Sequence, residues 1–134
     1  MQVDVTERVR WWPRKGVEVA REMSGADMRV ALGYLGFTLD SFSKYAGRDL
    51  RDLKRMQSGK LGVSGPVRDN IEALEADADA QLADWVAQAD RGEVIVLPKL
   101  NFIPDRGELP PHWELSLAGR LREIRPRAEF VWSD

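Results

Sequence analysis

The spacing of apolar residues changes along the chain and suggests where its parts begin and end. Over residues 3–12, apolar and polar residues alternate, which is typical of a strand. A turn at residues 13–16 and a second alternation at 17–19 then predict a β-hairpin. In an alternative interpretation, residues 1–22 are an over-extended reading frame and the natural product begins at Met23. The codons for Glu18 and Val19 could form a ribosome-binding sequence at a suitable distance before Met23.

From residue 24 the apolar spacing becomes helical, and capping residues divide the region into short helices. Ser24, Thr38 and Asp49 are side chains that cap helix N-termini, so each predicts the start of a helix. Pro66 suits the first turn of a fourth helix. The predicted ends fall on glycine, which adopts the left-handed backbone of a C-cap without strain, at Gly36, Gly47 and Gly59.

A long helix is predicted over residues 67–91, before Gly92. Its apolar residues are three or four apart and form a narrow stripe: Ile71, Leu74, Ala78, Leu82, Trp85 and Ala89. Such a stripe packs either into the core of the same chain or against a second copy as a coiled coil. The helix could break near Asp77.

The last third of the chain predicts strand, helix, strand. Residues 94–97 are a continuous apolar run, typical of a buried strand. Residues 101–111 hold three prolines and a glycine and predict a loop; a helix then begins near Trp113 and ends before Pro126. Residues 128–132 predict a second strand, parallel to the first. We therefore expect an α+β fold, with an extension at 1–22, a helical domain at 23–91 and an α/β segment at 92–134.

The composition argues against catalysis. The chain has no cysteine and a single histidine, His112, which removes thiolate and multi-histidine metal sites and most covalent nucleophiles. The carboxylates of residues 72, 75, 77 and 79 are expected on a solvated face, and the five tryptophans in the core or at interfaces. No apolar run approaches the roughly 20 residues of a membrane span. We expect a cytoplasmic protein that is not an enzyme, with no cofactor and no membrane partner.

Positive charge is concentrated in residues 47–60, although the net charge of the chain is −2. This stretch holds five basic and two acidic residues. A short turn sets two helices steeply across each other, which would leave the second helix exposed with Arg51, Lys54 and Arg55 on its surface. A projecting basic helix fits the DNA major groove, about 12 Å wide. The alternative is a solvated helix face.

In residues 24–75, "LGFT" opens one helix, Gly47 occupies the turn after it, and "SGK" follows the next helix. In this order the segment resembles the lambda Cro/repressor-type (XRE) helix-turn-helix family. The resemblance implies a five-helix domain that binds double-stranded DNA. It implies base contacts from Leu50, Arg51 and Arg55, and phosphate contacts from Thr38, Asp49, Lys54 and Lys60. Arg48 and Asp52 complete the expected DNA-binding set; Asp52 either weakens phosphate binding or accepts a hydrogen bond from cytosine.

The order of elements after residue 65 is similar, more weakly, to that of the YdiL-like anti-CRISPR-associated autorepressors, whose C-terminal α/β part dimerises. We therefore expect a homodimeric, sequence-specific DNA-binding regulator in a bacterial or phage-infected host cell. We expect it to act as a repressor, and one option is that it represses its own operon. Two alternatives remain. One is an antitoxin that binds a partner toxin as well as DNA. The other is a protein-interaction module that has lost DNA binding, which Leu39, Asp49 and Asp52 favour because they depart from the family pattern.

Overall fold

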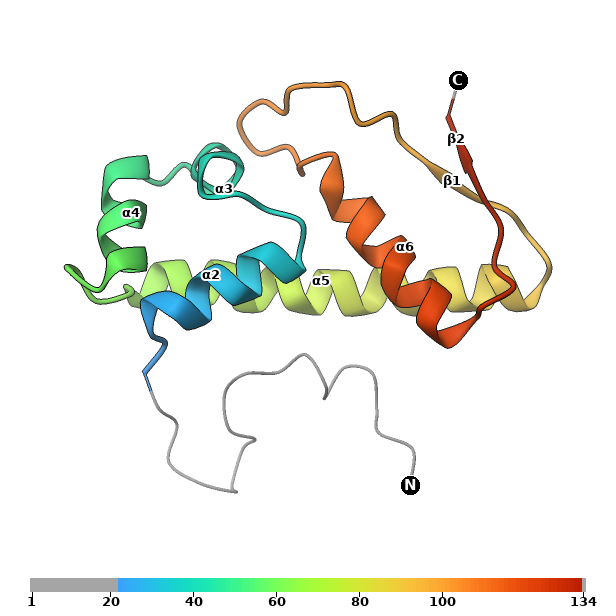
Figure 1. The fold of residues 1–134 in the computed structure, drawn as a ribbon, viewed down its shortest axis with the longest axis horizontal. Coiled ribbons are helices and arrows are strands. Elements are labelled where there is room, and N and C mark those ends of the chain that lie inside the picture. The colour runs from blue at the N-terminus through green and yellow to red at the C-terminus, as the bar shows by residue number, and fades with distance from the viewer. Residues whose placement is uncertain (1–21, 134) are drawn as a thin grey trace.

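The computed structural model describes residues 22–133, and these form five helices and one two-stranded parallel sheet (Figure 1). The elements are α2 (Gly25–Tyr34), α3 (Leu39–Ala46), α4 (Leu50–Ser58), α5 (Gly65–Asp90), β1 (Ile95–Leu97), α6 (His112–Ile124) and β2 (Phe130–Trp132). The fold is therefore α+β and mostly helical, as expected. The predicted hairpin, with Trp11 and Trp12, lies outside the described residues.

The short helices begin and end where the capping residues predict. The Ser24 hydroxyl accepts a hydrogen bond from the Asp27 N–H, and the Asp27 carboxylate accepts one from the Ser24 N–H, both at 3.0 Å. These reciprocal bonds form a capping box, which satisfies two N–H groups that the helix leaves unpaired. Gly47 ends α3 in the left-handed conformation, with φ 65°. The predictions of a capped start and a glycine end are thus confirmed for α3 and α4.

Helix α5 is one continuous helix of 26 residues without a break at Asp77. For this reason the described part of residues 23–91 holds four helices, α2 to α5, and the expectation of five in that range is wrong. The apolar stripe of α5 packs against α2, α6 and β1 of the same chain. Its members Ile71, Leu74, Ala78 and Leu82 are buried. The stripe is therefore part of the core rather than a coiled-coil seam.

The two strands pair in parallel, as predicted, with Ile95 beside Phe130 and Leu97 beside Trp132. Helix α6 makes the connection between them. The expectation of a buried strand at residues 94–97 holds for one face only. Ile95 and Leu97 face the core, whereas Val94 and Val96 are 40% and 56% exposed. Alternate residues of a strand point to opposite faces, and the outer face of this sheet is exposed at Val96 and Val131.

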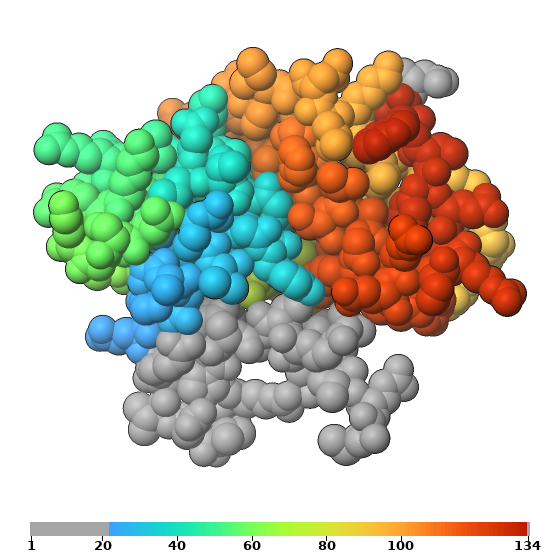
Figure 2. All heavy atoms as spheres, viewed as in Figure 1, coloured from blue at the N-terminus to red at the C-terminus, as the bar shows by residue number. Residues whose placement is uncertain are grey.

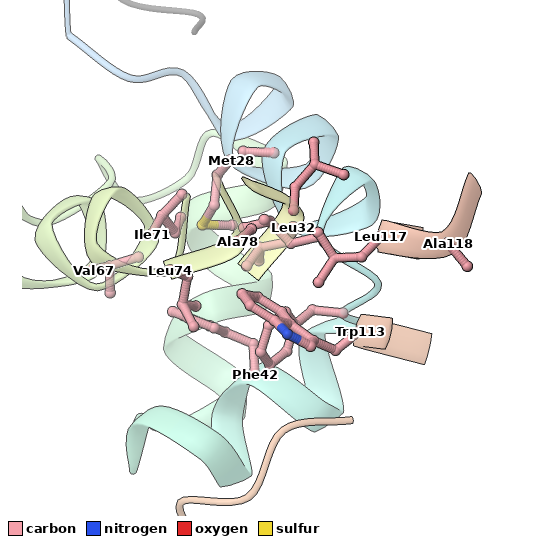
Figure 3. Close-up of a cluster of buried hydrophobic side chains, with 14 of the residues drawn as sticks. Met28, Leu32, Phe42, Val67, Ile71, Leu74, Ala78, Trp113, Leu117 and Ala118 are labelled. Atoms are coloured by element: carbon pink, nitrogen blue, oxygen red, sulfur yellow. The ribbon is translucent and has the colours of Figure 1, made fainter. Parts of the chain in front are cut away.

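Helix α6 belongs to the same hydrophobic core as the N-terminal helices, as the close-up in Figure 3 shows. Helix α4 and the C-terminal strands nevertheless lie at opposite ends of the molecule (Figure 2). The ring of Trp113 meets Phe37 edge to face, with centroids 6.0 Å apart. The indole Nε1 of Trp113 donates to Gln81 Oε1 of α5 at 3.0 Å. The backbones also approach closely, because a Cβ on Gly36 would lie 2.4 Å from the carbonyl oxygen of His112.

Part of the acidic face of α5 is buried rather than solvated. Asp79 accepts a hydrogen bond from Arg120 of α6 at 3.0 Å, and both side chains are more than nine-tenths buried. The Arg120 guanidinium also lies 5.2 Å from the centre of the Tyr34 ring. Glu75 is 3% exposed. The prediction of a solvated face is therefore wrong for Glu75 and Asp79, and for Asp79 the reason is that α6 covers this side of α5.

No helix in residues 22–133 combines the length and the apolar character needed to cross a bilayer.

Replacing Trp113 by alanine is expected to lower the free energy of unfolding by about 3–5 kcal/mol, because the change opens a cavity between Phe37, α5 and α6. The measurement is chemical denaturation followed by circular dichroism. Val30→Ala is the control: Val30 is 71% exposed on α2, so its loss should change stability by less than about 0.5 kcal/mol. Equal stability of the two variants would contradict a shared core.

Candidate nucleic-acid interface

Helices α3 and α4 are joined by a three-residue turn, residues 47–49, that hydrogen bonds hold in place. The Arg48 N–H donates to the Ser43 carbonyl at 3.0 Å, and the Ser43 hydroxyl donates to the Arg48 carbonyl at 2.6 Å. On the inner side of α4, Leu53 and Met56 are buried against α2 and α3. These contacts fix one face of α4 to the protein and leave the opposite face exposed.

The exposed face of α4 carries cations that have no acidic partner. Arg51, Lys54 and Arg55 are exposed, and Lys60 is exposed just beyond the Gly59 cap. Within residues 22–133, none of the four forms an ion pair with a carboxylate, although Asp49 and Asp52 lie at the N-terminal end of the same helix. Leu50 is half-buried and Asp52 is exposed beside them. Positive charge on this surface is therefore available to a ligand.

Some other cations of the described chain are paired with carboxylates. Lys44 lies 3.5 Å from Asp40, Arg125 lies 2.6 Å from Asp90, and Arg91 pairs with Glu93. The hydrogen bond from Arg125 lowers the pKa of the Asp90 carboxyl below its usual value. Of these pairs, only Arg125–Asp90 joins two elements, the end of α6 to the end of α5; the other two are exposed pairs of residues close in the sequence. On α4, by contrast, Arg51, Lys54 and Arg55 form no such pair within residues 22–133.

Arg48 differs from the other expected DNA-binding residues. Its Nε and Nη2 both donate to Asn70 Oδ1 of α5, at 3.1 and 3.0 Å, and the side chain is half-buried. Arg48 therefore ties the α3–α4 turn to α5. Asn70 had no recognisable signal in the sequence, because its partner lies 22 positions away.

Thr38 and Asp49 act as N-caps. The Thr38 hydroxyl accepts a hydrogen bond from the Ser41 N–H at 3.0 Å, and Asp49 Oδ1 accepts one from the Asp52 N–H at 3.2 Å. Both residues are exposed at helix N-termini, where an acidic side chain is favoured by the helix dipole. The carboxylate of Asp49 thus has a structural reason to stand at this position.

A segment from the C-terminal part of the chain also lies beside the α3–α4 turn. The loop between β1 and α6 passes over the α3–α4 turn, and the Gly107 N–H donates to the Lys44 carbonyl at 3.4 Å. The sequence contained no signal for this contact, which joins residues far apart in the chain.

Residues 22–133 contain no group of three or more His, Cys, Asp or Glu side chains that could hold a metal ion. No family model and no curated protein sequence matches the chain.

Replacing Arg48 by alanine is expected to lower the free energy of unfolding by about 1 kcal/mol, because it removes the hydrogen bonds that connect the turn to α5. Arg51→Ala removes an exposed side chain that has no ion pair within the described part of the chain, and should change stability by less than about 0.5 kcal/mol. Urea denaturation of both variants tests the difference. If Arg51→Ala is the more destabilising change, this division between structural and free arginines is wrong.

Proposed function

We propose that the protein is a sequence-specific DNA-binding transcriptional regulator that uses α3, the turn and α4 as a helix-turn-helix. The observation that carries this proposal is the exposed face of α4, where Arg51, Lys54, Arg55 and Lys60 have no carboxylate partner among residues 22–133. The resemblance of residues 24–75 to XRE regulators supports the same function. A protein of this kind represses by occupying a promoter, and its own promoter is the first one to test.

The roles of the residues on α4 follow from their positions. Arg51 and Arg55 are four residues apart and project from one side of the helix. An arginine fork matches the O6 and N7 atoms of guanine, and a good bidentate contact discriminates by roughly 1–3 kcal/mol. Lys60 lies beyond the end of the helix, where it contacts phosphate only. Asp52 repels the DNA backbone unless a cytosine faces it.

We further propose that the regulator is a homodimer joined through its C-terminal sheet. A mostly apolar groove of about 340 Å³ lies between α6 and β2. It is lined by Leu97, Leu115, Ala118, Phe130, Val131 and Trp132, together with Gly119 and Arg122. Strand β2 has an aromatic residue on each side of Val131, namely Phe130 and Trp132, and β1 pairs with only one of its edges. The β2 strands of two copies can therefore pair antiparallel through the other edge, with Val131 at the two-fold axis. A two-stranded sheet is marginally stable alone, and such pairing would extend it to four strands. The two α4 helices would then read an inverted repeat.

The same apolar groove also favours a second candidate function, that of a protein-interaction module or an antitoxin. In that case a different protein occupies the groove. An antitoxin forms a stable complex with a second protein and also binds DNA. An interaction module forms such a complex but has no salt-sensitive affinity for DNA.

Alanine variants of α4 and of Lys60 are expected to change DNA affinity in different ways, according to whether the replaced side chain contacts bases or phosphates. Arg51→Ala and Arg55→Ala should weaken binding to a duplex selected from a random library and relax the preference at one base pair. Lys60→Ala should weaken all duplexes alike and reduce the salt slope by about one. Asp52→Ala should raise affinity for scrambled duplexes. Fluorescence anisotropy at several salt concentrations measures all four. Identical behaviour of the variants on both duplexes would mean that α4 is only a solvated face.

The protein is expected to be a dimer at tens of micromolar by light scattering, with and without DNA. Trp132→Glu should make it a monomer, because Trp132 is 55% exposed at the proposed pairing edge and a carboxylate there would be buried without a partner. Val30→Glu, at a similarly exposed position of α2, is the control and should remain a dimer. A wild-type monomer would rule out this interface.

A further inference from the structure

We propose that Arg106, on the loop between β1 and α6, binds a backbone phosphate of the same DNA duplex that α4 reads. The inference rests on the proposed function and extends it, because it adds a DNA contact from the C-terminal part of the chain. The ligand class is the phosphodiester that flanks the base pairs read by α4.

The loop brings Arg106 to the start of α4. After β1 the chain crosses back over the molecule toward α3 before it enters α6 (Figure 1). One guanidinium nitrogen of Arg106 lies 3.0 Å from the point where a Cβ on Gly47 would stand. Gly47 is two residues before Asp49, the N-cap of α4. Arg106 is therefore beside the N-terminal end of α4, the end whose residues contact base edges when a recognition helix enters the major groove.

An open groove separates the loop from the turn and is large enough for a phosphate. It measures about 740 Å³ and is lined by Lys44, Arg48 and Asp49 on one side and by Ile103, Asp105 and Arg106 on the other. Phosphates border the major groove on both strands, so a helix that enters it brings adjacent protein surface close to the DNA backbone. The groove between loop and turn is such a surface.

Of the three cations at this groove, Arg106 alone is uncommitted within residues 22–133. Lys44 lies 3.5 Å from the carboxylate of Asp40, and the guanidinium of Arg48 donates twice to Asn70. Arg106 is exposed and has no ion pair with any described carboxylate. A guanidinium binds phosphate with two parallel N–H···O hydrogen bonds, which makes arginine well suited to this contact.

The loop is ordered around Arg106 by its own hydrogen bonds. The Asp105 N–H donates to Glu108 Oε1 at 2.8 Å, and the Glu108 N–H donates to the Asp105 carbonyl at 3.0 Å. Asp105 Oδ1 accepts from the Arg106 N–H at 2.7 Å, so this carboxylate is engaged with the loop backbone. Because these bonds order the backbone before DNA arrives, binding costs little conformational entropy.

The first test is the salt dependence of binding to a scrambled duplex. Arg106→Ala should reduce the salt slope by about one and lower affinity several-fold at low salt, with unchanged base preference. Arg106→Lys should retain most of the slope, because it keeps the charge. Arg127→Ala is the matched control: Arg127 is also exposed and without an ion pair among the described residues, but it lies in the turn between α6 and β2, away from α4. It should bind as the wild type does.

The second test locates Arg106 on the DNA. The chain has no cysteine, so Arg106→Cys introduces a single thiol for an iron chelate that cleaves nearby DNA. Cleavage is expected at the backbone next to the selected base pairs, and Arg127→Cys with the same chelate should not cleave there. Wild-type salt slope in Arg106→Ala, or absence of cleavage from position 106, would overturn the inference. If Arg51→Ala still weakens binding in that case, the proposed function stands. If the wild type binds no duplex, both are wrong.

Discussion

The contact between Trp113 and Phe37 constrains much of the remaining structure. Trp113 is in the first turn of α6, so its burial fixes where that helix begins, against the backbone of Gly36. From this point α6 crosses α5, covers part of its apolar stripe and leads the chain to β2 beside β1 (Figure 1). The chain must also return from β1 to the start of α6. The loop that makes this return passes the α3–α4 turn, which brings Arg106 close to Gly47.

The cations of the described chain differ in the role that their surroundings allow. Arg48 and Arg120 are hydrogen-bonded to α5, to Asn70 and Asp79, and they connect elements that are distant in sequence. Burying a charge is tolerable only when it is paired, so these partners are part of the fold. Arg51, Lys54 and Arg55 project into solvent from a helix whose inner face is already packed. Their charge contributes nothing evident to the fold, and for this reason the proposed function is built on them.

Local chemistry made part of this structure predictable. The caps Ser24, Thr38 and Asp49 and the C-cap Gly47 act through neighbours three or four residues away, so the helices could be predicted from the sequence. The burial of Asp79 under Arg120, the pairing of Arg48 with Asn70 and the approach of Arg106 to Gly47 join distant residues. No local pattern encodes such contacts. The candidate site was therefore predictable along α4, but its boundary with α5 and the loop was not.

The unbroken course of α5 has a consequence for the geometry of recognition. A helix of 26 residues at about 1.5 Å per residue is roughly 39 Å long. It connects the end of the molecule that carries α4 with the end that carries the sheet. A hinge near Asp77 would have let the two ends adjust to each other. Without one, a symmetric dimer joined at the sheet would hold its two α4 helices at a fixed distance. It would then select operators by the spacing of their half-sites as well as by their bases.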